Sequence, residues 1–286
     1  MKFTFIREHL QEFPVEVSCQ VLEVSRSGYY DWLDRVMSQQ AKRREDLKVK
    51  IKKTHDENRR VYGSRRVCAA LLAEGETVCE NTVAKLMKQL EIKAKGRKTF
   101  VPRTTDSRHD QPVAKNILNR EFEANRPNRK WATDITYIPT GQGWLYLAGV
   151  IDLCSKKIVG WSMADHMRTD LVSDALKMAV TRRSPEPGLL HHSDRGVQYA
   201  SDDYRALLQR HQMQSSMSGK GDCWDNACTE SFWATLKTEL VHHEQYVTRE
   251  QARQSIFEYI EIFYNRKRLH SSLEYLSPEA FEARFN

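Results

Sequence analysis

Residues 131–163 read WATDITYIPTGQGWLYLAGVIDLCSKKIVGWSM, and this stretch decides the fold. Its first part, WATDITYI (131–138), alternates with period two, which predicts a strand that has Asp134 near its middle. A second strand, WLYLAGVIDL (144–153), follows a glycine-containing turn, and a third, KIVGWSM (157–163), follows another short turn. Strands joined by turns this short pair with their neighbours, so the stretch predicts an antiparallel meander.

Helices and strands alternate in the rest of this half of the chain. The sequence predicts helices at 169–181, 202–211 and 225–240, and strands at GLLHHSD (188–194) and QSSMS (214–218). Together with the meander they give a mixed five-stranded sheet with flanking helices. This order of elements is that of an α/β ribonuclease H-like fold. The fold alone does not establish a function.

Three acidic residues stand out in this half. A carboxylate in the middle of a strand, such as that of Asp134, is costly to bury without a cation or hydrogen bonds. Asp194 ends a predicted strand and precedes Gly196, which permits a sharp turn of the backbone. Glu230 lies about 200° around its predicted helix from Phe232, and it therefore faces away from the apolar stripe.

These three acids offer hard oxygen donors on two strands and a helix, without Cys or His among them. Such a set suits Mg²⁺ or Mn²⁺ better than zinc. Two such ions about 4 Å apart activate a water or a 3′-hydroxyl on one side of a phosphodiester and stabilise the leaving oxygen on the other. Taken singly, each acid can instead be a cap, a turn residue or a surface charge. The combination predicts a site for divalent metal ions.

Charge is distributed unevenly along the chain, whose net charge is +7. Residues 41–130 carry 24 Lys and Arg against 12 Asp and Glu, a net +12, whereas residues 1–40 carry a net −2 and residues 131–286 a net −3. A basic middle joined to a slightly acidic half indicates that one part holds a polyanion and that the other has a different task. A solvated basic face is the alternative.

A helical segment, residues 1–40, opens the chain. VEVSCQVLEV has helix-compatible spacing, and residues 25–28 interrupt the pattern before YYDWL. This arrangement fits a small helix-turn-helix or merely a helical hairpin.

Residues 41–96 predict three more helices. The second has Ser64 as its N-cap, and the third follows a turn at Gly75. These two fit a helix-turn-helix DNA-binding domain in which Lys85 and Lys88 reach phosphates, although many bundles that bind no DNA share the pattern.

The periodicity disappears after residue 96. Residues 97–127 are basic and contain prolines, which predicts an extended linker that tracks a polyanion or crosses the surface of the next domain. The remaining residues, 128–286, hold the α/β core and C-terminal helices.

Composition excludes several classes of protein. No apolar run approaches the roughly 18 to 20 residues that a bilayer span requires, so we expect no contact with a membrane. Six scattered cysteines without a CxxC pair predict neither a disulfide framework nor a structural zinc site, and they indicate a reducing, cytoplasmic compartment.

Four segments resemble, in order, the signature blocks of one family of enzymes. They are WATDITYI, HSDRGVQYAS (192–201), GDCWDNACTESFWATLK (221–237) and YNRKRLHSSLEYLSPEAF (264–281). They resemble the OrfB-type DDE transposases of the insertion-sequence-3 family, and the 59 and 35 residues that separate the three acids are similar to the spacing in that family and in retroviral integrases. Upstream, ENRRVYGSRRVCAALLAEG (57–75) resembles the helix-turn-helix block of the same chains.

The resemblance implies a role for each acid. Asp134, Asp194 and Glu230 match the catalytic, metal-binding triad, which implies two Mg²⁺ ions, with Mn²⁺ as a substitute. The implied reaction is hydrolysis at the 3′ ends of a mobile element, followed by attack of the new hydroxyls on target DNA. Lys237 matches a basic residue that contacts the terminal DNA. The nucleoid of a bacterial cytoplasm is the implied location.

Nine residues are candidate DNA contacts. For His192 the alternative is a packed strand histidine, and for the cluster at 264–270 it is hydrogen bonding between helices. The full set is Arg65, Arg66, Lys85, Lys88, His192, Lys237, Arg266, Arg268 and His270.

The implied partners are the terminal inverted repeats of the element, target DNA and an upstream OrfA-type product. Chains of this family are commonly also made as a fusion with that product, which carries its own coiled coil. No long heptad run is visible here, so we expect the fusion or the upstream product to supply multimer formation on DNA. Two other functions remain open, namely a ribonuclease H-like nuclease without transfer activity and a non-catalytic DNA-binding repressor.

Overall fold

The structure is a computed structural model that describes residues 1–96, 112–219 and 223–285. Of the predicted linker, 97–127, residues 97–111 therefore lie outside the described residues. By internal contacts the chain forms two compact units, Met1–Lys50 and Ile51–Asn286, and helix α4 (Gln39–Glu57) runs across the division.

Three short helices form the first unit: α1 (Lys2–Glu8), α2 (Val15–Val21) and α3 (Arg26–Leu33). They pack around a small core of Ile6, Cys19 and Tyr29. The predicted interruption between two helices is present but lies earlier, at residues 22–25, because Ser25 is the N-cap of α3 and its hydroxyl accepts the Gly28 amide at 3.0 Å. The first helix has no clear apolar period, and the sequence did not reveal it.

The second unit begins with the end of α4, followed by α5 (Ser64–Ala73) and α6 (Glu80–Gln89). Their apolar stripes meet, and Val67, Leu71 and Val83 are completely buried. The three predicted helices are thus confirmed. The predicted N-cap is wrong: Gly63 occupies that position, and Ser64 is the first helical residue.

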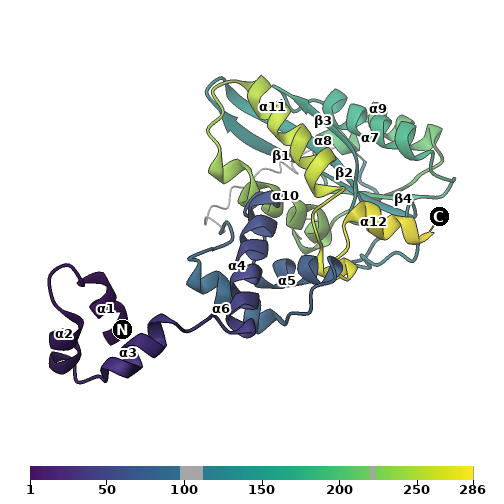
Figure 1. Cartoon of the computed structure of the whole chain (residues 1–286). Coiled ribbons are helices and arrows are strands. Elements are labelled where there is room, and N and C mark those ends of the chain that lie inside the picture. Colours follow the sequence, from purple (N-terminus) through teal and green to yellow (C-terminus); the bar gives the residue numbers. More distant parts are fainter. Residues whose placement is uncertain (97–111, 220–222, 286) are drawn as a thin grey trace. The chain divides into compact units, whose positions relative to one another are not determined.

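A mixed five-stranded sheet forms the centre of this unit (Figure 1). Strands β1, β2 and β3 form the predicted antiparallel meander, and β4 and β5 add to β1 in parallel, which gives the order β3-β2-β1-β4-β5. The predicted ribonuclease H-like order is confirmed. The strands are β1 (Lys130–Thr140), β2 (Gly143–Asp152), β3 (Ile158–Ala164), β4 (Leu190–Ser193) and β5 (Gln214–Met217).

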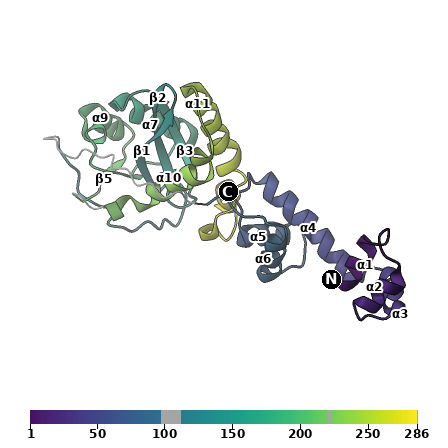
Figure 2. The ribbon, with the colours of Figure 1, turned by 90° about the vertical axis from the view of Figure 1, so that its left-hand side faces the viewer.

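Helices cover both faces of the sheet (Figures 1 and 2). One face packs against α7 (Thr169–Arg183), α8 (Val197–Ala200) and α9 (Asp202–Arg210) around a large apolar cluster. The other carries α10 (Ala227–Glu239) and α11 (Arg249–Phe257). With helices on both faces, most of β1 is buried, but Asp134 and Ile135 in its middle stay partly accessible.

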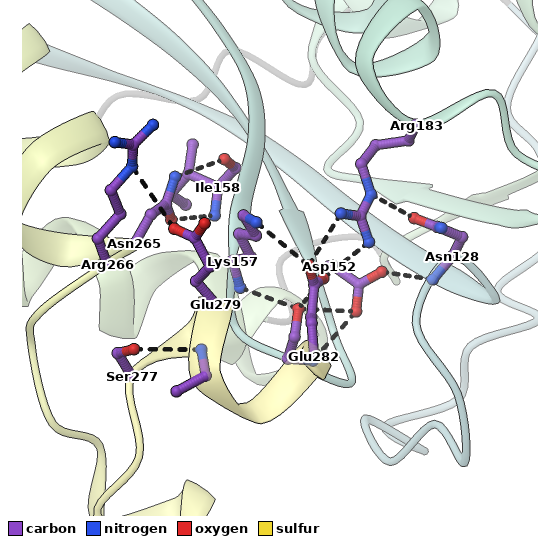
Figure 3. A network of polar contacts seen from close by, with 12 residues as sticks. Asn128, Asp152, Lys157, Ile158, Arg183, Asn265, Arg266, Ser277, Glu279 and Glu282 are labelled. Atoms are coloured by element: carbon purple, nitrogen blue, oxygen red, sulfur yellow. Dashed lines mark hydrogen bonds and ion pairs between the residues drawn. The ribbon is translucent and has the colours of Figure 1, made fainter. Parts of the chain in front are cut away.

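The C-terminal segment is tied to the sheet by buried polar contacts (Figure 3). After α11 comes a π-helical segment, Glu258–Tyr264, and a short helix, α12 (Pro278–Glu282), follows later. In this network Glu282 accepts both terminal nitrogens of Arg183 at 2.7 and 2.8 Å. The side-chain amide of Asn265 bonds the main chain of Ile158 in both directions, like an extra partner for edge strand β3.

The described part of the predicted linker packs on the sheet. Leu118 is buried, and the Ser216 hydroxyl on β5 accepts its amide at 3.1 Å. Arg120 donates to Asp225 at 2.9 Å. Residues 112–127 therefore cross the surface of the α/β core, as one of the two alternatives stated. The Asp225 carboxylate also accepts the Gly219 amide at 2.7 Å, and Asn226 occupies the N-cap position of the helix that follows.

Candidate active site

Asp134 lies in the middle of β1, directly opposite Gly149 of β2. One carboxylate oxygen accepts the amide of Ile135 at 2.8 Å. The other accepts the indole N–H of Trp233 at 3.0 Å. Both bonds stabilise the ionised carboxylate and hold it in one orientation.

A glycine on the neighbouring strand makes the Trp233 contact possible. A Cβ atom at Gly149 would lie 2.7 Å from the Trp233 ring, closer than real Cβ contacts. The bare backbone of β2 therefore lets the indole lie across the strand and reach Asp134. Trp233 itself is buried.

Asp194 follows the last residue of β4 and lies level with Asp134. Because β1 and β4 are parallel with Ala132 opposite His192, the same register places residues 134 and 194 beside each other. One oxygen of Asp194 accepts the Gly196 amide at 2.9 Å, in the turn that the glycine was expected to permit. The two acids thus meet where neighbouring parallel strands separate.

The two carboxylates influence each other's ionisation. Burial raises the pKa of the Asp134 carboxyl well above its usual range, and the negative charge of Asp194 raises it further. The charge of Glu230 acts in the same direction on Asp134. These carboxylates repel one another, and a cation bound between them would offset that repulsion.

Glu230 lies in the first turn of α10, exposed to solvent. Trp233 follows it by three residues, so the two side chains share a face of the helix. Since Trp233 reaches Asp134, that face is turned toward the two aspartates. Partial burial raises the pKa of Glu230.

The oxygen donors of these acids fit a hard divalent cation, but the described residues do not form a complete set of metal ligands. Asp134 and Asp194 provide two adjacent carboxylates, and Glu230 lies at the mouth of the same site. Within the described ranges, no three His, Cys, Asp or Glu side chains are grouped closely enough to hold an ion. The chemistry of the donors, all oxygen, suits Mg²⁺ or Mn²⁺.

Lys237 lies beside the acids, two turns after Glu230 on α10. Its ammonium group sits 5.0 Å from the centre of the Tyr137 ring. Burial lowers the pKa of Lys237, whereas the negative charge of Asp134 opposes that shift. A cation is therefore held close to the carboxylates, on the face predicted from helical spacing.

Other candidate DNA contacts are accessible on the surface. Arg65, on the first turn of α5, is exposed and lies 3.3 Å from Glu80. Lys85 and Lys88 are exposed on α6. Arg266 is exposed beside Glu279, at 3.5 Å. These positions leave the charged groups free to exchange a surface partner for a phosphate.

Four predicted DNA contacts are instead engaged within the protein. His192 is fully buried between two serines, with ring nitrogens 2.9 Å from the Ser216 hydroxyl and 3.2 Å from that of Ser218. Its prediction as a phosphate contact is wrong, and the packed strand histidine is correct. Burial lowers its pKa to about 4, so the ring is neutral at neutral pH.

The cluster near residue 270 is likewise internal. Arg268 is buried and pairs with Glu239 at 2.7 Å. Its guanidinium also donates to His270 at 3.1 Å, and burial lowers the pKa of that histidine to about 2. Arg66, half-buried, lies 3.6 Å from the same glutamate. Arg268 and His270 thus take the alternative stated for their cluster, hydrogen bonding within the protein, whereas Arg66 forms an ion pair and stays partly exposed.

Trp233 and Gly149 were missed as site residues. The sequence signal for Trp233 is its spacing of three from Glu230, which places both on one helical face. Gly149 carries no comparable signal, because its role depends on a strand register and on helix docking.

Family models match three parts of the chain. Residues 124–223 and residues 230–284 each match a model described as integrase core domain, and residues 42–100 match one described as HTH-like domain. The protein is therefore of the class that joins an integrase core to an HTH-like domain.

Curated relatives narrow this class to one family. The chain is 44% identical over 286 residues to transposase InsF for insertion sequence IS3A of Escherichia coli (strain K12), covering 99% of this chain and 98% of the relative. It is also 44% identical over 268 residues to the insertion element IS600 uncharacterized 31 kDa protein of Shigella sonnei, covering 94% and 98%. The chain belongs to the IS3 family of transposases.

Among solved structures, a chain of the simian T-cell lymphotropic virus intasome in complex with PP2A regulatory subunit B56 gamma aligns with 81% of this chain and 74% of its own length. The alignment has 14% identity and a TM-score of 0.48, too distant to bear on function. In the part of the chain that the structure describes, no helix is long and apolar enough to cross a membrane.

Proposed function

We propose that this transposase cuts DNA at the ends of an insertion sequence and joins those ends to target DNA, with Asp134, Asp194 and Glu230 as its catalytic acids. The observation that carries the proposal is that Asp194, directly after β4, lies beside Asp134 in the middle of parallel β1, with the Glu230 face of α10 turned toward them. In this proposal the two aspartates and Glu230 act together on one phosphodiester.

The same three carboxylates would hold divalent metal ions, which we propose are two Mg²⁺, with Mn²⁺ able to substitute. When bound, such ions activate the attacking oxygen and stabilise the leaving oxygen of a phosphodiester. The protein's own residues prepare the site. Trp233 fixes the carboxylate of Asp134, and Lys237 places a positive charge beside the acids, where it can bind a phosphate of the element end.

DNA binding would divide between two regions. Residues 41–96 form the proposed DNA-binding domain, in which Arg65, Lys85 and Lys88 contact phosphates. Arg266 is the accessible candidate in the C-terminal segment. In this proposal residues 1–40 form a separate helical segment, residues 97–127 a linker, and residues 128–286 the catalytic domain.

We propose further that an upstream OrfA-type product, free or fused, supplies multimer formation on DNA. One small recognition domain typically buries only about 600–1,000 Å², which rarely selects two element ends by itself. The isolated chain should therefore self-associate weakly and join paired ends poorly, and fusion should restore both. A stable multimer of the isolated chain that joins two specific ends efficiently would show that the upstream product is dispensable.

Product analysis tests the proposed reaction. The chain, alone and fused to its upstream product, is incubated with labelled element-end DNA, plasmid and Mg²⁺. Joined end–plasmid molecules are expected, and they should disappear when Mg²⁺ is chelated. Nicked DNA without joined product would establish the nuclease alternative, and metal-independent binding without any cut would establish the repressor.

A further inference from the structure

Glu239, the last residue of α10, is the centre of a buried polar cluster. Arg268 grips its carboxylate with two nitrogens, at 2.7 and 2.8 Å. The Tyr259 hydroxyl donates to the same carboxylate at 2.7 Å. The C-terminal segment alone therefore neutralises and hydrogen-bonds this acid.

The DNA-binding helices reach the same point. From the first turn of α5, the Arg66 guanidinium lies 3.6 Å from the Glu239 carboxylate. The Lys95 ammonium donates to the main-chain oxygen of Glu239 at 3.3 Å, which places a cation at the C-terminus of α10. Nearby, the Tyr62 hydroxyl donates to the Lys267 carbonyl at 3.1 Å.

A contribution to the stability of the fold does not explain why Arg66 lies beside Glu239. Its side chain is 26% exposed and is the second guanidinium on a carboxylate that Arg268 already neutralises. Burial lowers the pKa of Arg66, and the positive charge of Arg268 lowers it further. A second, partly buried cation brings desolvation and like-charge repulsion, which the shared carboxylate and the Tyr62 ring, 5.9 Å from the Arg66 guanidinium, offset only in part.

The position of α10 gives this contact a consequence at the catalytic site. Glu230 precedes Glu239 by nine residues, about 13.5 Å along a helix. Trp233, between them, bonds to Asp134. A helix of this length moves as a rigid rod, so displacement of its last turn shifts Glu230 and Trp233 relative to β1.

We propose that Arg66 is a positioning residue, which holds α10 in register with the DNA-binding helices so that the catalytic step, rather than DNA affinity, depends on it. Its neighbour Arg65 points to solvent and is the DNA contact. Arg65 thus contacts DNA, whereas the adjacent Arg66 positions α10. Through Arg66 and α10, DNA that is bound by α5 is coupled to the position of Glu230. This inference rests on the proposed function of the two regions.

Steady-state joining by the full chain, fused to its upstream product if that is required, tests the inference. Arg66→Gln should lower kcat at saturating end DNA at least tenfold and change KM for that DNA less than twofold. Arg65→Gln should raise KM severalfold instead. Arg210→Gln, exposed on α9, removes the same charge elsewhere and should change neither parameter. Arg66→Lys, which keeps the charge without the planar fork, should fall between wild type and Arg66→Gln.

Hydrogen exchange of the DNA-free chain separates positioning from general instability. Arg66→Gln should speed amide exchange in α10 and in residues 265–270 and leave β1–β3 unchanged. Uniformly faster exchange, unchanged kcat, or an increase in KM alone would overturn the inference.

If Arg66→Gln does not fold, Lys95→Met removes the neighbouring contact with α10 and must show the same loss of kcat. An unchanged KM in Arg65→Gln would instead contradict the proposed DNA contact and leave the positioning role standing.

Discussion

Asp134 is partly buried beside a second carboxylate, and its ionisation works against folding when no cation is bound. Because its pKa is raised in the folded protein, the stability contributed by its neutral form is fully present below the unfolded pKa of about 3.9 and is lost as pH rises through the folded pKa. Asp134→Asn removes this loss. In urea unfolding without metal, the variant should gain on the wild type between pH 4 and neutrality. A constant difference across that range would contradict the raised pKa.

Gly149 is the second residue whose environment makes a direct prediction. Gly149→Ala puts a methyl group 2.7 Å from the Trp233 ring, so the indole must move off Asp134. We expect a loss of about 1–3 kcal/mol in stability and a slower joining reaction. Gly96→Ala, where a Cβ meets nothing within 4 Å, is the matched control and should be nearly neutral. Equal effects in thermal unfolding of the two variants would rule out the proposed clash.

For single residues, the sequence predicted the place within a strand or helix better than it predicted whether the side chain is buried. Alternation placed Asp134 in mid-strand, and helical spacing put Lys237 on the side of Glu230. The same alternation could not tell that His192 is enclosed by β5, because that depends on a strand more than twenty residues later. For the same reason the charge of Arg268 was taken for a DNA contact, although its partner Glu239 lies 29 residues away.

Among the elements, α12 offers a comparison between a buried and an exposed ion pair on one short helix. Glu282 is buried and binds Arg183, whereas Glu279 is exposed beside Arg266. Glu282→Ala leaves a largely buried guanidinium unpaired and should cost about 3 kcal/mol in unfolding free energy. Glu279→Ala should cost at most about 1 kcal/mol. Similar losses of unfolding free energy for the two variants in chemical denaturation would show that the Glu282–Arg183 pair does not hold α12 in place.

Strong periodicity determined which elements the sequence could reveal. Strand β1 was found because it alternates, β2 and β3 because they are short apolar runs that follow turns, and α6 because its apolar residues repeat along one face. The helix α8, with four residues, is too short to show a period, and α1 is held by a three-helix core that its own sequence does not display. For residues 112–127 the sequence could not choose between tracking a polyanion and crossing the core, because their contacts, main-chain amides with Ser216 and the Arg120 side chain with Asp225, have no periodicity.

At the scale of the whole molecule, the net charge of +12 in residues 41–130 predicts where DNA affinity resides. Removing two phosphate contacts by Lys85→Gln and Lys88→Gln should weaken binding and reduce the slope of log affinity against log salt by about 0.9 for each. Lys177→Gln, exposed on α7 in the acidic half, should leave that slope unchanged. Equal slopes for the double variant and the wild type in a salt titration would contradict this division of tasks.

The rate of strand transfer in triad variants tests the central claim most directly. Asp134→Asn, Asp194→Asn and Glu230→Gln are compared with wild type and with Asp203→Asn, an exposed carboxylate on α9, using element-end DNA, plasmid and Mg²⁺. Each triad variant should lose joining while DNA affinity and folding persist, and Asp203→Asn should join normally. A triad variant that kept more than about a tenth of the wild-type rate, a barrier change of only about 1.4 kcal/mol, would contradict its role as a catalytic acid.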